Sequence, residues 1–538
     1  MPGQDNEILA ATSQQKRQLE PFSFERYLTW IPPRDRTLLL LIILVGFLMR
    51  IWDLGRPSFW YDEVLTLNRS ESLFEDSKGL LLRPPCYYFL AWLSIQFFGA
   101  SEISLRLPSV LFGTLSIPLV YIFTARIQRS NNVANQPILA AALLTIFPLH
   151  IAVSREAKEY ALLAFLVLLV MFLVVEAVHR KSLKLVFAGA VIQAIAFFTN
   201  FLAFTVFFPV CFFLWLRWPR EKRSNNLEKT PIYATGIFSL FPTLLYGFWL
   251  LIPREGFHEP TKGLELSNWV GFEDVYWYLL LLLLYIGGGL LLVFKTLFEW
   301  YSKREDQVFV FAYYVLVFLV LSAYRLKAQR YFAIAVPITV ILLAEGLKWL
   351  YESLSIEKPD FRTKKAKFLV IIGLIGSTLL MPTLFILGFL AGDAQAGYHP
   401  DWRGACAYVK AKANPEEDTF WSTHGTTGIA THYLGEEYQV GDVVELENML
   451  PSLRNLTQGQ IWIIVTKNRF ERKIPQELQR WIIAQGSLVW DTRAEDLTTQ
   501  MLADTANDLV SLFGVNSMKW WSLDRMHVYI IQNHPQAL

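Results

Sequence analysis

Long runs of apolar residues dominate the chain, and they constrain its fold more than any other feature. Hydrophobic side chains make up 53% of the 538 residues, whereas charged side chains make up 18%. The apolar runs are mostly about 16 to 22 residues long, which is the length that an α-helix needs to cross a hydrocarbon core of about 30 Å. A soluble globular domain does not carry many such runs. The sequence therefore predicts a polytopic α-helical membrane protein.

We predict about eleven transmembrane helices. They are residues 38–52, 105–125, 137–153, 160–178, 184–199, 201–216, 231–252, 276–294, 308–323, 331–349 and 368–390. This pattern divides the chain into a cytoplasmic segment (1–36), a transmembrane domain (37–390) and a soluble domain (391–538).

The distribution of basic residues predicts the orientation of the chain. With a cytoplasmic N-terminus, every second loop is also cytoplasmic, and these loops hold clusters of Lys and Arg, as the positive-inside rule requires. The clusters are Arg126 and Arg129; Arg180 and Lys181; Arg217, Arg220, Lys222 and Arg223; Lys303 and Arg304; and Lys358, Arg362, Lys364, Lys365 and Lys367. We therefore expect an integral protein of the plasma (inner) membrane.

One apolar segment, residues 84–98 (PPCYYFLAWLSIQFF), does not fit the count of crossings. As a helix it would be only about 22 Å long, which is short for a crossing. Its Tyr, Trp and Phe residues favour the membrane interface. A full crossing here would also place the basic loops outside. We therefore predict an interfacial helix within a first outer loop that runs from residue 53 to about residue 104.

The last part of the chain, residues 391–538, is mixed and charged in composition. Residues 402–413 and 475–485 have helical patterns, and residues 419–422, 461–466 and 526–532 are typical of short buried strands. With eleven crossings, this α/β domain lies on the outer face of the membrane.

The first outer loop contains the acidic pair Asp62-Glu63 in the sequence FWYDEVLTLN. Carboxylates at a membrane surface are costly without a task. The alternative is a solvated loop in which Trp60 and Tyr61 anchor the interface.

Other predicted outer loops also carry charged residues. These are Arg83, Glu102 and Arg106; Arg155, Glu156, Lys158 and Glu159; Arg254, Glu255, His258 and Glu259; and Arg325, Lys327 and Arg330. Cations outside oppose the topological bias, so a specific reason for them is expected. Together they could surround a phosphate and leave a general base nearby. The alternative is a set of unrelated surface ion pairs.

Several motifs are absent from the sequence. It contains no GxxxxGK[ST], no GxGxxG that opens a helix and no HExxH. Cys86, Cys211 and Cys406 have no CxxC spacing, so neither a zinc site nor a disulfide framework is indicated. The net charge of +2 does not suggest a nucleic-acid partner. The glycines at 287–289 lie in an apolar span, where they indicate close helix packing or flexibility.

Several segments, taken together and in order, resemble a known family. These are FWYDE, then RPPCYYFLAWLSIQFFGASEISLRLPSVLFGTLSIPLVYIFTARI, PLHIAVSREAKEYALLAF, FFTNFLAF and QRYFAIAVP. They resemble the bacterial branch of the protein O-mannosyltransferase-like enzymes, which belong with the lipid A aminoarabinose transferase to the C-type membrane glycosyltransferases. The resemblance implies transfer of a hexose or pentose from a polyprenyl-phosphate carrier, with inversion, on the outer side of the membrane.

The resemblance also implies roles for individual residues. Asp62 matches the catalytic carboxylate, Glu63 its acidic neighbour and Glu156 a second acidic position. Arg83, which stands before Pro-Pro, and the pair Arg330-Tyr331 match positions near the donor phosphate, and we add Lys158 as a further phosphate ligand. The chain departs from the pattern by having Arg83 and Asn200 where His is common, which leaves the class of acceptor open.

The expected partners are a polyprenyl-phosphate-linked sugar, the bilayer and a glycan, lipid or protein acceptor. A monophosphate leaving group is already a stable anion, so no cofactor is required. A divalent metal held by His258 with Glu63 or Glu156 is the alternative. A second functional hypothesis is a lipid-linked sugar or polysaccharide flippase or transporter. The Asp62-Glu63 pair, with no ionisable residue near the middle of a predicted span, favours the enzyme.

Overall fold

The computed structural model of the chain describes residues 31–74, 84–128, 135–217, 230–251, 277–301, 304–324, 328–355, 369, 372–380, 383, 400–423, 425–446, 459–491 and 526–531. The predicted segment 1–36 lies mostly outside these residues, and so does the predicted boundary at residue 390.

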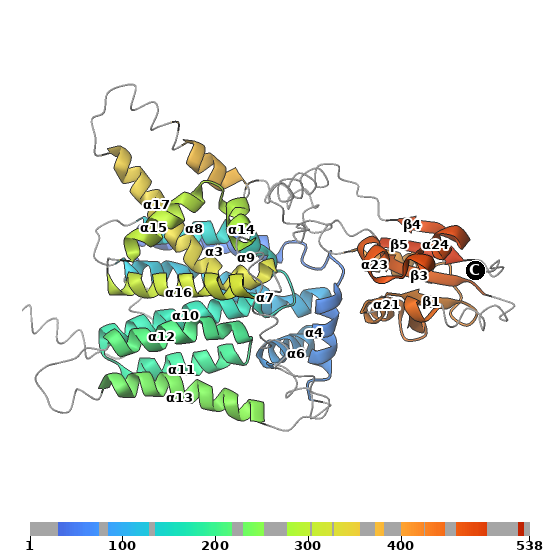
Figure 1. The fold of residues 1–538 in the computed structure, drawn as a ribbon, viewed down its shortest axis with the longest axis horizontal. Coiled ribbons are helices and arrows are strands. Elements are labelled where there is room, and N and C mark those ends of the chain that lie inside the picture. The colour runs from blue at the N-terminus through green and yellow to red at the C-terminus, as the bar shows by residue number, and fades with distance from the viewer. Residues whose placement is uncertain are drawn as a thin grey trace, which may run out of the picture.

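The described residues up to 355 form a bundle of helices, most of which run side by side (Figure 1). In chain order they are α3 (Pro33–Ile51), α4 (Tyr61–Glu71), α6 (Cys86–Phe98), α7 (Glu102–Ile127), α8 (Gln136–Ile146), α9 (Pro148–Val153), α10 (Tyr160–Arg180), α11 (Leu183–Phe197), η1 (Phe201–Ala203), α12 (Phe204–Arg217), α13 (Thr230–Leu251), α14 (Trp277–Ile286), α15 (Gly289–Trp300), α16 (Glu305–Ala323), η5 (Gln329–Ala335) and α17 (Val336–Ser355).

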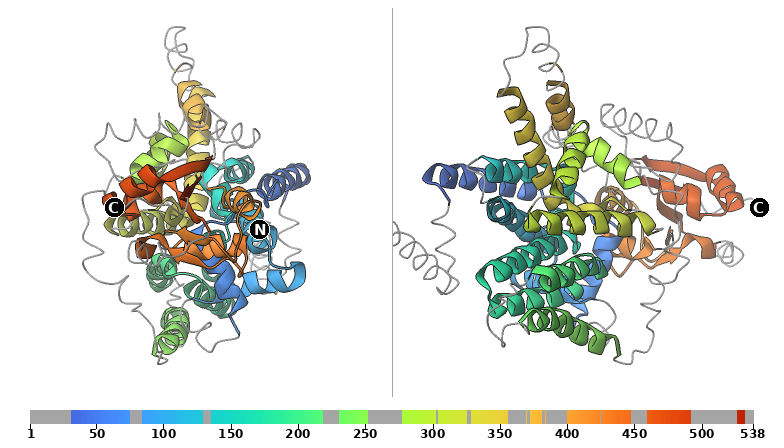
Figure 2. Two further views of the ribbon diagram at one scale, coloured as in Figure 1. Left: turned by 90° about the vertical axis from the view of Figure 1, so that its right-hand side faces the viewer. Right: turned by 60° about the vertical axis from the view of Figure 1, so that its left-hand side comes forward.

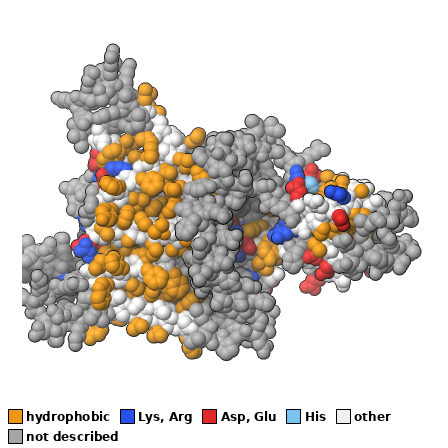
Figure 3. Space-filling view, in the orientation of Figure 1, with side chains coloured by type: hydrophobic (Ala, Val, Ile, Leu, Met, Phe, Trp, Pro, Cys, Tyr) orange, Lys and Arg blue, Asp and Glu red, His pale blue; other side chains and the backbone are white. Residues whose placement is uncertain are grey.

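Four segments of the described chain are long and apolar enough to cross a membrane. They are Glu102–Ile127, Tyr160–Arg180, Glu305–Ala323 and Gln329–Ser353. The space-filling view shows a broad hydrophobic band over this part of the molecule (Figure 3). The helical membrane architecture is therefore confirmed, whereas the count of about eleven crossings stays a prediction.

Two predicted spans are each broken into two helices, and local chemistry explains both breaks. Phe147 leaves the helical region because it precedes Pro148, which disfavours helical geometry at the residue before it. Gly287 has a φ of +47°, and a Cβ atom there would lie 2.5 Å from the carbonyl oxygen of Ser377. The glycines at 287–289 thus mark a close approach of two helical segments, as predicted.

Helix α6 has 13 residues and is among the shorter apolar helices rather than the candidate spans. It packs between α4 and α7. Phe97 and Phe98 at its end are exposed. This short helix with aromatic residues on its surface agrees with the predicted interfacial segment.

The described residues from 400 onwards form a five-stranded sheet with helices. The strands are β1 (Thr419–Ser422), β2 (Val440–Asp442), β3 (Ile461–Thr466), β4 (Gly486–Asp491) and β5 (Met526–Ile531), and the helices are α20 (Trp402–Lys410), α21 (Thr427–Leu434), α23 (Lys467–Lys473) and α24 (Gln476–Gln485). The strand order is β2-β1-β3-β5-β4. Strand β1 pairs in parallel with β2 and β3, whereas β5 is antiparallel to β3 and β4. All six side chains of β3 are buried, as expected for a central strand covered on both faces.

This α/β domain lies beyond one end of the helical bundle, next to α4 and α6 (Figures 1 and 2). At the opposite end of the long helices, Glu176 forms ion pairs with Arg126 and Arg180. Arg126 and Arg180 are thus at the end of the bundle opposite to the α/β domain, and the sidedness of the chain stays a prediction.

Cysteine labelling can test the sidedness. In a background without Cys86, Cys211 and Cys406, we expect a membrane-impermeant maleimide to label an Ala100→Cys variant in intact cells. A Lys184→Cys variant should be labelled only after permeabilisation, because it lies at the basic end, and both positions are exposed. Labelling of Lys184→Cys from outside would show that the predicted orientation is wrong, and it would mean that residues 84–98 cross the membrane.

Candidate active site

Asp62 is a partly exposed carboxylate at the start of α4. Trp60, in extended conformation, precedes the helix, so Asp62 lies in its first turn, where the helix dipole favours a negative charge. Its Oδ2 atom is 3.2 Å from Nη2 of Arg330, and the two side chains remain 22% and 28% exposed. This ion pair joins the first predicted outer loop to η5, which precedes α17.

Arg330 is held by aromatic rings, and one of its N–H groups has no hydrogen-bond partner among the described residues. Its guanidinium lies over the rings of Trp60 and Tyr160, at 5.1 and 5.8 Å from their centroids. Such contacts orient a cation without using its N–H groups. The buried Nε atom has no hydrogen-bond partner among the described residues. The ring of Tyr331 packs against Tyr160 and Tyr324 beside it.

Glu63 has an environment opposite to that of its neighbour Asp62. It is fully buried, and Arg106 in α7 binds it with two parallel contacts, Nε to Oε1 at 2.8 Å and Nη2 to Oε2 at 2.6 Å. The backbone N–H of Ala157 also donates to Oε1, at 2.8 Å. Successive residues of a helix point in different directions, so α4 places the Glu63 carboxylate in the core and the Asp62 carboxylate toward Arg330.

Arg106 also organises the chain that leads to Asp62. Beyond its pair with Glu63, it donates to the carbonyl oxygens of Leu54, Pro57 and Ser58, at 2.7, 2.9 and 3.2 Å. All three nitrogens of this buried guanidinium therefore have partners. The residue was recognised in the sequence only as one of several outer cations, because nothing in the sequence separates it from the others.

The segment between α9 and α10, residues 154–159, brings a second set of charges to the same place. Glu156 is 6% exposed, and burial raises its pKa to about 7, while Arg330 acts in the opposite direction. Lys158 is 8% exposed, and its side chain has no hydrogen bond or ion pair to a described residue. Its carbonyl oxygen accepts a hydrogen bond from Ser109 at 3.0 Å, which holds this turn against α7.

The structure thus brings Glu156, Arg330 and Tyr331 close to Asp62. Glu63 points into the core, and Lys158 follows Glu156 by two residues in the same turn. Arg83 and His258 lie outside the described residues. Sequence reasoning missed the ring of Trp60 under Arg330 and the hydrogen bond from Asn200 to Glu159, at 3.0 Å. Among the described residues, no group of three or more His, Cys, Asp or Glu side chains could hold a metal ion.

Residues 82–249 match the model of the family described as dolichyl-phosphate-mannose-protein mannosyltransferase. The match spans about a third of the chain, which is similar to this family over those residues. The predicted resemblance to the mannosyltransferase-like proteins is therefore confirmed. The matched segment includes Glu156 and Lys158, whereas Asp62 and Arg330 lie outside it.

Solved structures show where the fold recurs. ArnT from Cupriavidus metallidurans, solved with undecaprenyl phosphate, is similar over 93% of this chain and 99% of that chain, with a TM-score of 0.53 and 13% identity. AglB, the oligosaccharyltransferase of Archaeoglobus fulgidus solved with an inhibitory peptide and a dolichol-phosphate, is similar over 80% of this chain and 69% of that chain, with a TM-score of 0.52 and 10% identity. At such identities the similarity shows a shared fold, which is the predicted C-type membrane glycosyltransferase fold.

An uncharacterized protein of Aquifex aeolicus is 26% identical over 328 residues. The match covers 57% of this chain and 63% of that relative.

The burial of Glu63 makes a prediction about stability. A Glu63→Gln substitution should lower the free energy of unfolding by about 3–5 kcal/mol, because it leaves the charge of Arg106 buried without its counter-ion. Thermal unfolding in detergent measures the effect. A matched control is Glu352→Gln, which removes a longer pair with Lys348, at 3.8 Å, in which the Glu352 side chain is 44% exposed; it should change stability by about 0.5 kcal/mol or less. Equal melting temperatures for the two variants would contradict a structural role for Glu63.

Proposed function

We propose that the chain is an inverting glycosyltransferase, which moves a sugar from a polyprenyl-phosphate carrier to a hydroxyl acceptor on the outer face of the plasma membrane. The observation that carries this proposal is the pairing of a partly exposed carboxylate, Asp62, with a guanidinium, Arg330, that has an unused N–H group. The family name and the polyprenyl phosphates in the ArnT and AglB structures support the same class of donor.

Asp62 is the general base in this proposal. A hydroxyl is a poor nucleophile, and a carboxylate that takes its proton during attack at the anomeric carbon makes the reaction feasible. The new glycosidic bond forms as the bond to the phosphate oxygen breaks, so attack from the opposite face inverts the anomeric centre. The released polyprenyl phosphate carries away the electron pair.

Arg330 and Lys158 are the proposed ligands of the donor phosphate, with Tyr331 beside them. Charge-assisted hydrogen bonds from fixed cations stabilise the negative charge that grows on the leaving group. A buried lysine without a described partner is costly, and an anionic ligand would remove that cost. Arg83 is a further proposed ligand from the first outer loop.

The two remaining carboxylates have different proposed roles. Glu63 was expected among the catalytic residues, and its full burial and its pair with Arg106 support a structural role in this proposal. We assign it the role of orienting α4. Glu156 interacts electrostatically with Arg330. In this proposal its charge adjusts how strongly Arg330 binds the donor phosphate.

The flippase hypothesis would use the same cations to hold a lipid phosphate, but it needs no base. Replacing Asp62 therefore separates the two functions. Asp62→Asn should lower sugar transfer by about 10²–10⁴-fold, which is the typical contribution of a general base. Binding of radiolabelled polyprenyl phosphate should stay at the wild-type level or become tighter, because Arg330 loses a competing negative charge.

Asp53→Asn is a matched control. Asp53 lies in the same loop in an exposed pair with Arg56, and Asn tolerates its positive φ of 49°. This variant should transfer sugar at the wild-type rate. Wild-type transfer by Asp62→Asn would exclude this residue as the base.

The raised pKa of Glu156 predicts a pH dependence of donor binding. Below pH 7 the carboxyl is mostly protonated and neutral, whereas above pH 7 its charge competes with the donor phosphate for Arg330. The KM for the donor should therefore rise severalfold as the pH increases through about 7. Glu156→Gln should flatten this rise, because the amide does not titrate. An unchanged pH profile in the variant would show that Glu156 does not control how strongly Arg330 binds the donor phosphate.

A further inference from the structure

We propose that the C-terminal α/β domain positions the catalytic carboxylate, with Tyr433 and Arg403 as positioning residues that grip the segment immediately before Asp62. The inference rests on the proposed function of Asp62 as the base. It makes the α/β domain a part of the active site, although its positioning residues follow Asp62 by several hundred residues in the chain.

The hydroxyl of Tyr433, in α21, joins two elements of the membrane domain. It accepts a hydrogen bond from the backbone N–H of Phe59 at 2.6 Å and donates one to Oε1 of Glu102 at 2.7 Å. Burial and the charge of Glu102 raise the pKa of Tyr433, so the hydroxyl stays protonated and keeps its donor. The neighbouring ring of His432 packs edge-on against Phe59, with centroids 5.3 Å apart.

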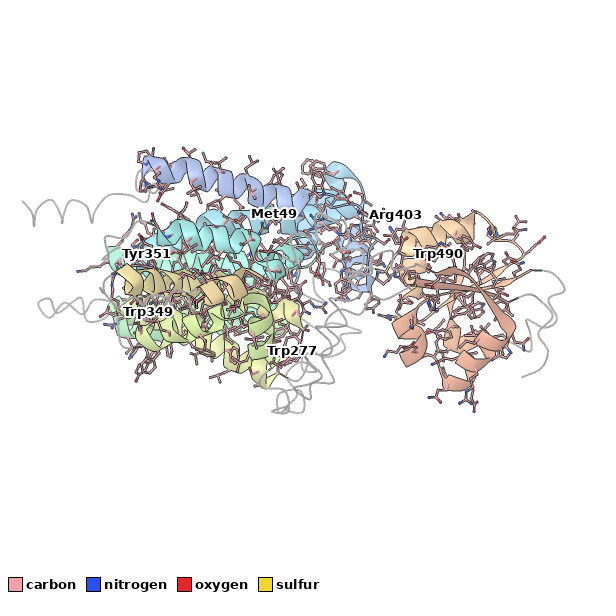
Figure 4. All side chains as sticks on the ribbon, turned by 90° about the horizontal axis from the view of Figure 1, so that it is seen from above. Met49, Trp277, Trp349, Tyr351, Arg403 and Trp490 are labelled. Atoms are coloured by element: carbon pink, nitrogen blue, oxygen red, sulfur yellow. The ribbon has the colours of Figure 1, made fainter. Side chains whose placement is uncertain are left out.

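Arg403, at the start of α20, makes a second set of contacts to the same segment (Figure 4). Its Nη2 atom donates to the carbonyl oxygen of Gly55 at 3.0 Å and forms an ion pair with Glu102. Its backbone N–H donates to Oγ of Ser58 at 3.1 Å, and that hydroxyl lies 3.5 Å from Oδ1 of Asp401. The α/β domain therefore contacts residues 55, 58 and 59 by directed polar bonds.

The opposite side of this segment is held by the membrane domain. Arg106 binds the carbonyl oxygens of Leu54, Pro57 and Ser58. The segment is thus fixed between two anchors, one from each domain, and it passes directly into Trp60 and Asp62. Both of these residues contact Arg330. A shift at Phe59 would consequently change the distance between the base and the phosphate-binding guanidinium.

A shift of the segment 55–59 should therefore affect the rate of turnover more than the binding of the donor. The proposed phosphate ligands Arg330 and Lys158 belong to other elements, and Tyr160 still holds the Arg330 guanidinium when Trp60 shifts with the segment 55–59. A misplacement of about 1 Å can cost about 100-fold in rate when reacting groups are no longer aligned. Loss of the grip should therefore lower kcat and leave the donor KM almost unchanged.

The test compares Tyr433→Phe with Tyr438→Phe. Both tyrosines are at least partly buried in the same domain, but Tyr438 packs on Phe420 and its hydroxyl makes no hydrogen bond to a described residue. In the full-length membrane protein, Tyr433→Phe should lower kcat by about ten- to hundredfold. Its donor KM should stay within about twofold of the wild-type value, and Tyr438→Phe should keep both parameters.

Hydrogen exchange measured by mass spectrometry provides a readout that does not depend on the reaction. The peptide covering residues 54–62 should exchange faster in Tyr433→Phe, since the N–H of Phe59 loses its acceptor, and it should be unchanged in Tyr438→Phe. If the wild-type protein transfers no sugar, the proposed function fails, whereas this exchange measurement still decides whether the grip exists.

Unchanged exchange in Tyr433→Phe would overturn the grip. Faster exchange with wild-type kcat would overturn its role in positioning Asp62. Arg403→Ala provides the same test if Tyr433→Phe does not accumulate, because the Arg403 side chain is 46% exposed and its removal leaves no buried group behind on its own side.

Discussion

The buried pair between Glu63 and Arg106 is the interaction on which the site depends. Burying two charges is costly unless every donor and acceptor is used, and here Arg106 satisfies both the carboxylate and three backbone carbonyl oxygens. The pair fixes the rotation of α4 about its own axis. It thereby turns Glu63 into the core and Asp62 toward Arg330, so that the two adjacent carboxylates have different environments.

Individual cations at the two ends of the bundle differ in how fully the described residues use their hydrogen-bonding capacity. At the basic end, Arg126 and Arg180 both bind Glu176. At the end near the α/β domain, Arg330 pairs with Asp62, but its Nε has no hydrogen-bond partner among the described residues, and the Lys158 side chain has no described partner. Cations that are neutralised internally stabilise the fold, whereas cations with free donors are available to an anionic ligand. The proposed phosphate site is therefore placed at the end near the α/β domain.

Hydropathy predicted the helical membrane architecture, whereas the location of the site stays a prediction. The sequence did not show that Asp62 and Glu63 would have different environments. Pro148 and Gly287 interrupt two predicted spans, because a long apolar run does not show where a backbone must bend. Strands β2 and β4 were missed because β2 has three residues and neither strand is fully buried. The different environments of Asp62 and Glu63 could not be predicted, since they depend on Arg106 and Arg330, which are distant in sequence. The contacts of Tyr433 have no sequence signal, because they arise only when two domains meet.

The central claim is that the end of the bundle beside Asp62 binds the phosphate of a polyprenyl carrier. A structure determined in lipid nanodiscs with undecaprenyl phosphate tests it most directly. The account predicts the phosphate within hydrogen-bonding distance of the Arg330 guanidinium and the Lys158 ammonium, with the Asp62 carboxylate facing the space where the sugar would lie. A phosphate bound instead at the opposite end, near Arg126 and Arg180, would contradict it.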